Sequence, residues 1–338
     1  MTTRAFIAGC SGSELTPDEA AFFREAAPWG FILFKRNVEA PEQVRALADA
    51  LRETVGRADA PILIDQEGGR VQRMGPPHWR RYPPGRVYGG LAASDPLAGR
   101  EVARLAARLI AHDLRSVGIT VDCLPVLDVP APGAHDIIGD RAYAEEPGAI
   151  AVLGRAAAEG LLAGGVLPVI KHIPGHGRAA ADSHEALPVV HASRRELELD
   201  FEPFRILSDM PLAMTAHVVY TAFDAEDPAT TSRKVVDEVI RGAIGFDGLL
   251  MSDDLSMKAL SGSFRERTEA ALAAGCDVAL HCNGNLEEMQ AVATGAPALS
   301  GKAQRRAENA LGRIRHQPEP IDPVDAHARL TAALAAVG

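Results

Sequence analysis

Eight short runs of mostly apolar residues recur along the chain, and segments with helical periodicity lie between them. The apolar runs span residues 5–10, 30–34, 61–66, 119–129, 166–173, 212–220, 248–255 and 277–283. Near-continuous apolar strands that alternate with helices are typical of a parallel sheet buried on both faces. Eight of them in one chain of 338 residues favour a (β/α)8 barrel over an open doubly wound sheet.

Helical periodicity is clearest over residues 16–27, 41–56, 97–118 and 147–165. The first of these segments begins with Thr16 as N-cap, Pro17 at the first helical position and Glu19 three residues on, which predicts a capping box.

Two further segments lie outside this alternation of strands and helices. Residues 75–90 predict an irregular loop, and residues 300–338 predict two helices packed on the outside of the barrel. We found no linker long enough to divide the chain. We therefore predict a single (β/α)8 TIM-type barrel domain over residues 1–338, with extra C-terminal helices.

The net charge and composition of the chain argue against some classes of binding partner. The formal net charge is -10, which disfavours a nucleic-acid surface, and we expect a small-molecule partner. No apolar run reaches the roughly 20 residues that span a bilayer, and the N-terminus lacks a signal-peptide pattern. The four cysteines form no CxxC pair, so neither a disulfide framework nor a cysteine zinc site is expected. We expect a soluble, cytoplasmic monomer that binds neither nucleic acid nor membrane.

Polar residues follow most of the predicted strands, at the end where such barrels carry their active sites. These residues are Asp65, Glu67 and Arg70 after the third strand, Asp128 after the fourth, Lys171 and His172 after the fifth, His217 after the sixth, Asp253 and Asp254 after the seventh, and His281 and Asn283 after the eighth.

Several of these residues also have a purely structural interpretation. Asp128 could accept hydrogen bonds from loop amides, and His217 and His281 could be hydrogen-bonded residues of the barrel mouth. Asp253 and Asp254 must point to opposite sides of an extended strand, so one faces the barrel axis while the other could cap the following helix. The pattern alone does not decide which.

The segment KHIPGHGRAAADSHEALP, residues 171–188, allows three chemical hypotheses. His172, His176 and His184 could bind a metal, although Pro174 and Gly175 rule out the helical spacing of a zinc motif.

The other two hypotheses use side-chain chemistry without a metal. Lys171 could form a Schiff base. Asp182 could orient His184 and favour its protonated form, making that histidine a general acid and base. A carboxylate nucleophile from the seventh strand would complete a two-step displacement at an electrophilic carbon.

The same segment resembles the KHFPGHG and DSHxxLP signature of bacterial family 3 glycoside hydrolases, specifically the β-N-acetylglucosaminidase (β-hexosaminidase) type. The stretches GFILFKRN, DQEGGRVQR, IIGDRAY and GFDGLLMSDDLSM resemble other blocks of that family, in the same order. The similarity covers roughly residues 5 to 290. Ile173 replaces a phenylalanine, and Arg178 to Ala181 replace a more polar run.

The resemblance implies a specific set of roles. Asp253 is the expected nucleophile, and His184 the acid and base, with Asp182 as its partner. The expected sugar-binding residues are Asp65, Arg73, Arg141, Lys171 and His172. The family uses no metal or organic cofactor.

The implied reaction is removal of terminal β-linked N-acetylglucosamine from (anhydro)N-acetylmuramic acid muropeptides during peptidoglycan recycling, with retention of configuration. Because glycines punctuate the segment, we expect His184 to enter the site only when substrate binds. The alternatives are another family 3 β-glycosidase, a metal-dependent barrel hydrolase, or a silent barrel that only binds.

Overall fold

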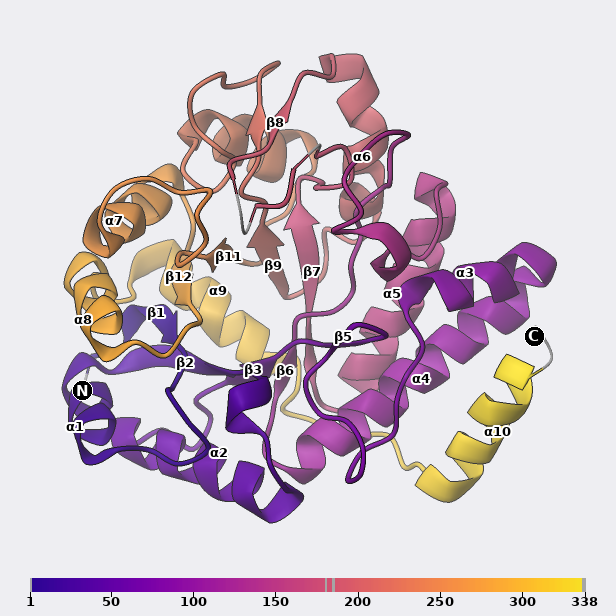
Figure 1. Ribbon diagram of the computed structural model, residues 1–338, viewed down its shortest axis with the longest axis horizontal. Helices are drawn as coiled ribbons and strands as arrows, with labels where there is room; N and C mark the ends of the chain where they lie inside the picture. The colour runs from indigo at the N-terminus through magenta and orange to yellow at the C-terminus, as the bar shows by residue number, and fades with distance from the viewer. Residues whose placement is uncertain (1, 180, 184–185, 336–338) are drawn as a thin grey trace.

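The computed structural model describes residues 2–179, 181–183 and 186–335. Within them, parallel strands close into a barrel in the order β1-β12-β11-β9-β7-β6-β3-β2, with helices around it (Figure 1). These strands are β1 (Arg4–Ala8), β2 (Pro28–Leu33), β3 (Ile62–Ile64), β6 (Val121–Asp122), β7 (Leu167–Ile173), β9 (Leu212–Thr215), β11 (Leu249–Asp254) and β12 (Val278–His281). Each lies within or overlaps one of the predicted apolar runs, so the (β/α)8 prediction is confirmed.

The helices follow the sequence periodicity closely. They are α1 (Pro17–Ala26), α2 (Pro41–Val55), α3 (Gly85–Ser94), α4 (Pro96–Ser116), α5 (Pro147–Ala163), α6 (Arg194–Ile206), α7 (Phe264–Ala274), α8 (Leu286–Gly295), α9 (Gly301–Gly312) and α10 (Pro323–Ala335), with short η1 (Lys35–Asn37), η2 (Gly139–Arg141) and a π-helical η3 (Val235–Ala243). The predicted capping box opens α1: Glu19 N donates to Thr16 Oγ1 over 3.2 Å, and Thr16 N to Glu19 Oε2 over 3.0 Å. None of the described helices combines the length and apolar character needed to cross a bilayer.

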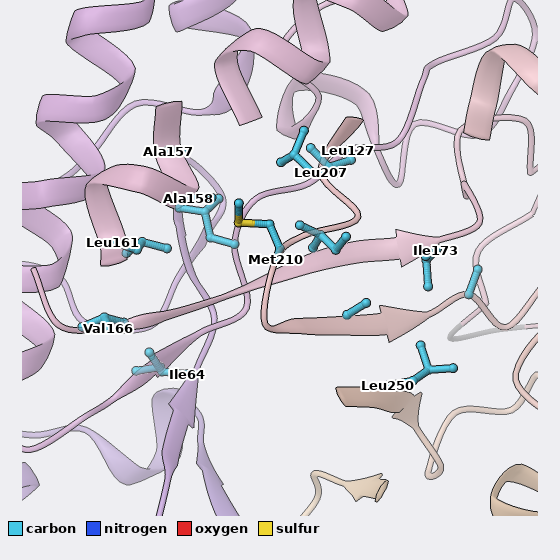
Figure 2. Packing of buried hydrophobic residues seen from close by; sticks show 14 of the residues in the cluster. Ile64, Leu127, Ala157, Ala158, Leu161, Val166, Ile173, Leu207, Met210 and Leu250 are labelled. Atoms are coloured by element: carbon cyan, nitrogen blue, oxygen red, sulfur yellow. The ribbon is translucent and has the colours of Figure 1, made fainter. Parts of the chain in front are cut away.

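Two layers of apolar side chains hold the barrel together. On β3, Leu63 belongs to the cluster inside the barrel, whereas Ile62 and Ile64 pack in the outer layer against the helices. Figure 2 shows part of that outer layer, to which α5 contributes Ala157, Ala158 and Leu161. Burying each larger side chain contributes about 1.5–3 kcal/mol. The strands are therefore fixed from both sides, and their carboxyl ends are held in register around the barrel mouth.

The C-terminal helices differ from the prediction in one respect. Helix α10 packs on the outside against α4, as expected. Helix α9 instead inserts Ala307 and Ala310 into the cluster inside the barrel, together with Trp29 and Leu249 near the starts of β2 and β11. It therefore closes the amino-terminal end of the barrel, opposite the end that carries active sites in this fold.

Three other segments were missed or placed wrongly. The predicted loop 75–90 is irregular only to Pro84, because α3 begins at Gly85. Strands β4 (Gln66–Gly68) and β5 (Val71–Gln72) form an antiparallel hairpin directly after β3. Strands β8 (Val189–Val190) and β10 (Val219–Tyr220) form a second small sheet. Both small sheets extend the chain beyond the carboxyl ends of barrel strands.

Candidate active site

A cavity of about 340 Å³ opens at the carboxyl ends of the barrel strands. Its polar lining residues are Asp65, Glu67, Arg70, Arg73, Arg141, Lys171, His172, His176, Ser183, Asp253 and Asp254. All five predicted sugar-binding residues and the predicted nucleophile are among them. The volume falls at the lower end of the range for small-molecule sites, about 300–1,000 Å³.

Lys171, at the end of β7, is the centre of a charged network on one wall. Its side chain is only 2% exposed, and Nζ lies 2.9 Å from Asp65 Oδ1 and 2.6 Å from Glu67 Oε1. Burial lowers the pKa of Lys171, but the two carboxylates outweigh burial and raise it above its ordinary value. Lys171 is therefore a fixed cation, a state that does not suit Schiff-base chemistry, which needs the free amine.

Two arginines complete this network. Arg73 Nη2 donates to Asp65 Oδ2 over 2.9 Å, and Arg141 makes two hydrogen bonds to Glu67, of 2.9 and 2.8 Å. Burial would raise the pKa of Glu67, but Arg141 and Lys171 lower it to about 2. The cations likewise hold the pKa of Asp65 below its ordinary value against the effect of burial. The wall therefore presents fixed donors and acceptors that suit sugar hydroxyls.

Asp128, buried behind this wall, has two structural roles. Its Oδ1 accepts the backbone amides of His172 and His176 over 3.2 and 2.7 Å, and its Oδ2 lies 2.7 Å from His172 Nδ1. Burial opposes its charge, yet His172 lowers the pKa of Asp128 to about 2. The predicted loop-amide role is thus confirmed, and the same carboxylate orients the His172 ring so that Nε2 remains for the cavity.

The structure distinguishes the two adjacent aspartates of β11. Asp254 Oδ1 accepts the backbone amides of Ser256 and Cys282 over 3.0 and 3.1 Å, so its carboxylate stabilises the turn after the strand. No helix begins there, since α7 starts only at Phe264, and the predicted helix cap is in fact a turn cap.

Of the two aspartates, Asp253 is the one whose carboxylate does not stabilise the turn and is therefore available to react. It is 6% exposed and lines the cavity, and its Oδ1 accepts the Asp254 amide over 2.8 Å. Burial favours the neutral acid, but nearby His217 and His172 shift the pKa of Asp253 below its ordinary value. Asp253 is therefore ionised at neutral pH, as a nucleophile must be.

Two histidines are structural: His217, which follows β9, and His281, which ends β12. His217 Nδ1 lies 2.7 Å from Thr230 Oγ1, and its Nε2 lies 3.0 Å from the Asp254 carbonyl. His281 Nε2 lies 3.0 Å from Glu288 Oε2. Neither of these two lines the cavity in the described part of the chain.

The predicted acid and base, His184, lies outside the described residues, and so does its predicted movement. Its predicted partner Asp182 is half-buried. The intervening Ser183 is buried and lines the cavity, with Oγ 3.8 Å from Met257 Sδ. Among the described residues, no group of three or more His, Cys, Asp or Glu side chains is arranged to hold a metal.

A model of the glycosyl hydrolase family 3 N terminal domain matches residues 20–316, a range that includes every cavity residue named above. The chain belongs to glycosyl hydrolase family 3. It is therefore a glycoside hydrolase, and the resemblance seen in its motifs is confirmed at the level of the family.

Individual relatives of this glycoside hydrolase cover most of the chain. The beta-hexosaminidase of Bordetella parapertussis is 40% identical over 278 residues, which are 81% of this chain and 78% of that protein. Native NagZ from Neisseria gonorrhoeae is 32% identical, with a TM-score of 0.84 over 100% of this chain and 97% of that one. A family 3 beta-N-acetylglucosaminidase from Paenibacillus has a TM-score of 0.86 at 30% identity, covering 97% of this chain and 67% of that one.

Sequence reasoning did not include Glu67 among the sugar-binding residues, although in the structure it lies between two of the predicted sugar-binding cations. The side chain is buried and contacts Lys171 and Arg141 at once. The signal was present in the sequence as a second acid within DQEGGR. Its partners, however, lie far along the chain, and only the fold brings the three together.

We expect Glu67→Gln to raise KM by about tenfold or more, because two buried cations lose the charge that fixes them. The free energy of unfolding should fall by about 3 kcal/mol, as when one partner of a buried pair is removed. Steady-state kinetics and urea unfolding measure both effects. The matched control is Glu145→Gln, which breaks an exposed pair with Arg86 and should change neither quantity appreciably. An unchanged KM in Glu67→Gln would contradict the positioning role.

Proposed function

We propose that this protein is a retaining exo-β-N-acetylglucosaminidase that removes terminal β-linked N-acetylglucosamine from (anhydro)N-acetylmuramic acid muropeptides. The observation that carries the proposal is the buried, ionised Asp253, which shares one cavity with the Asp65–Lys171–Glu67–Arg141 network. The names of the relatives support the sugar, since they are beta-hexosaminidases and beta-N-acetylglucosaminidases. The small cavity volume agrees with removal of a single terminal sugar.

The proposed reaction has two displacement steps. Asp253 attacks the anomeric carbon and forms an ester bond as the glycosidic bond breaks, while protonated His184 gives its proton to the leaving oxygen. Neutral His184 then takes a proton from water, whose oxygen bonds to the anomeric carbon as the ester bond to Asp253 breaks. Most glycosidases use a second carboxylate for the proton transfers. A histidine oriented by Asp182 makes the same switch between acid and base.

The sugar-binding wall has a defined part in this scheme. Lys171, Arg73 and Arg141 offer donors to hydroxyl oxygens, and Asp65 accepts hydrogen bonds from hydroxyl groups. His172, held by Asp128, adds one ring nitrogen on the same side of the cavity. A substrate fixed this way needs no metal to hold it. We place the reaction in cytoplasmic peptidoglycan recycling, carried out by a single-domain monomer.

The assay that tests this function compares p-nitrophenyl N-acetyl-β-glucosaminide with the corresponding β-glucoside. We expect cleavage of the first only, and proton NMR should show the β-anomer of N-acetylglucosamine as the first product. Release of the sugar from N-acetylglucosaminyl-anhydromuramyl peptides tests the natural substrate. Equal cleavage of the glucoside would favour another family 3 β-glycosidase. Loss of activity in a chelator, restored by zinc, would favour the metal-dependent alternative.

A further inference from the structure

His176 lines the cavity, yet its side chain has no role in the mechanism described above. The residue is 3% exposed and stands in the lining beside Asp253, His172 and Ser183. Its Nδ1 is fully buried and has no hydrogen-bond partner among the described residues. Buried polar atoms without a partner are rare and costly in native proteins, and a functional site is a common reason for them.

The turn that contains His176 does not need the imidazole. Gly175 adopts a φ of +138°, and a Cβ at Gly177 would meet the Val129 carbonyl oxygen at 1.9 Å, so the two glycines determine the path of the chain. The His176 backbone amide donates to Asp128 Oδ1 over 2.7 Å, and its carbonyl accepts the Ala179 amide over 3.0 Å. The backbone of His176 and its neighbours therefore determine the turn, and the His176 ring remains unexplained.

The ring is held in one place and in one charge state. It packs edge-on against the His172 ring, with 5.7 Å between centroids and an interplanar angle of 63°. Burial and neighbouring His172 lower the pKa of His176 to about 4, against the opposing influence of Asp128 and Asp253. At neutral pH the imidazole is therefore uncharged, with one N–H donor and one acceptor nitrogen.

We propose that His176 is an additional sugar-binding residue, whose imidazole hydrogen-bonds a polar group of the N-acetylglucosamine unit next to Asp253. This inference rests on the proposed function, because it takes the cavity as the site of that sugar. The imidazole has a buried nitrogen without a partner in the described part of the free protein, and it gains a hydrogen bond when the sugar binds. The residue thus lowers the stability of the free enzyme and strengthens the complex.

Two variants separate binding from folding. In His176→Phe a flat aromatic ring one atom larger remains and both nitrogens are removed, so the thermal midpoint should stay the same or rise. The same variant should lower kcat/KM by about tenfold or more and weaken the binding of N-acetylglucosamine, measured by calorimetry. His176→Gln, which keeps a donor and an acceptor, should recover part of the lost kcat/KM. If the phenylalanine variant does not fold, His176→Gln still tests whether the side chain binds the sugar.

His281→Phe is the matched control, because His281 is also buried with an unpartnered Nδ1 but does not line the cavity. It should keep the wild-type kcat/KM. The proposal is overturned if His176→Phe retains kcat/KM and N-acetylglucosamine affinity within twofold. It is also overturned if kcat falls more than about 1,000-fold and azide restores it, since that result assigns proton transfer to His176. A wild-type enzyme that binds the sugar without cleaving the N-acetyl-β-glucosaminide would contradict the proposed function alone.

Discussion

Asp253→Asn should reduce kcat by on the order of 10⁴- to 10⁶-fold, the scale seen when a covalent nucleophile is removed. The carboxylate is buried in the cavity, ionised, and held by the Asp254 amide, so an amide of the same shape would bind substrate without attacking it. KM or inhibitor binding should therefore change far less than kcat. Hydrolysis of p-nitrophenyl N-acetyl-β-glucosaminide measures the first quantity, and calorimetry with N-acetylglucosamine measures the second.

A slow 2-fluoro sugar inactivator identifies the nucleophile directly. Mass spectrometry of the inactivated enzyme should place the label on Asp253, since the glycosyl ester forms there. Asp254→Asn is the matched control: its carboxylate accepts two backbone amides, so its loss should cost about 1–3 kcal/mol of stability but leave the label in place. A label on any other residue would refute the mechanism.

The charge state of Asp253 also predicts the acid side of the pH profile. Burial favours the neutral acid, but His217 and His172 leave the pKa below its ordinary value, so the proposed nucleophile is charged throughout the neutral range. Loss of activity through Asp253 itself should begin only below about pH 4. A fall in activity at higher pH must therefore come from another group.

The barrel could be predicted from the sequence because its strands are apolar on both faces. For the same reason, the sequence pattern could not show which side chains of the seventh strand point into the barrel. Leu249 and Met251 belong to the cluster inside the barrel, whereas Leu250 packs in the outer layer. With apolar side chains on both sides, only the fold reveals that Asp253 continues the inward series. The family resemblance assigned the same residue from its motif.

Contacts between distant segments account for what the sequence did not reveal. The pairs Lys171–Asp65 and Arg141–Glu67 join residues 106 and 74 positions apart, so the role of Glu67 appears only once β3 and β7 are in place. At the opposite end of the barrel, the position of helix α9 was also not predictable. Nothing in its sequence indicates that its alanines pack against the cluster inside the barrel. The charged residues predicted at strand ends do line one cavity, but the sequence did not reveal which of them pair with one another.

His184→Ala should lower kcat by about 10²- to 10⁴-fold for natural glycosides, which need a proton on the leaving oxygen. The loss should be smaller for the p-nitrophenyl substrate, because p-nitrophenolate leaves without protonation. Asp182→Asn should produce a weaker form of the same defect, since it removes the charge expected to orient the imidazole and favour its protonated form.

This difference between substrates is what distinguishes an acid and base from a residue that only binds sugar. A binding residue would weaken both reactions alike, whereas a lost proton donor affects mainly the poor leaving group. Azide should restore turnover in His184→Ala by attacking the glycosyl ester on Asp253, giving a β-glycosyl azide detectable by mass spectrometry. His191→Ala, at an exposed histidine seven positions further on, should behave as wild type. Equal losses on both substrates, with no azide product, would move the proton transfer to another residue.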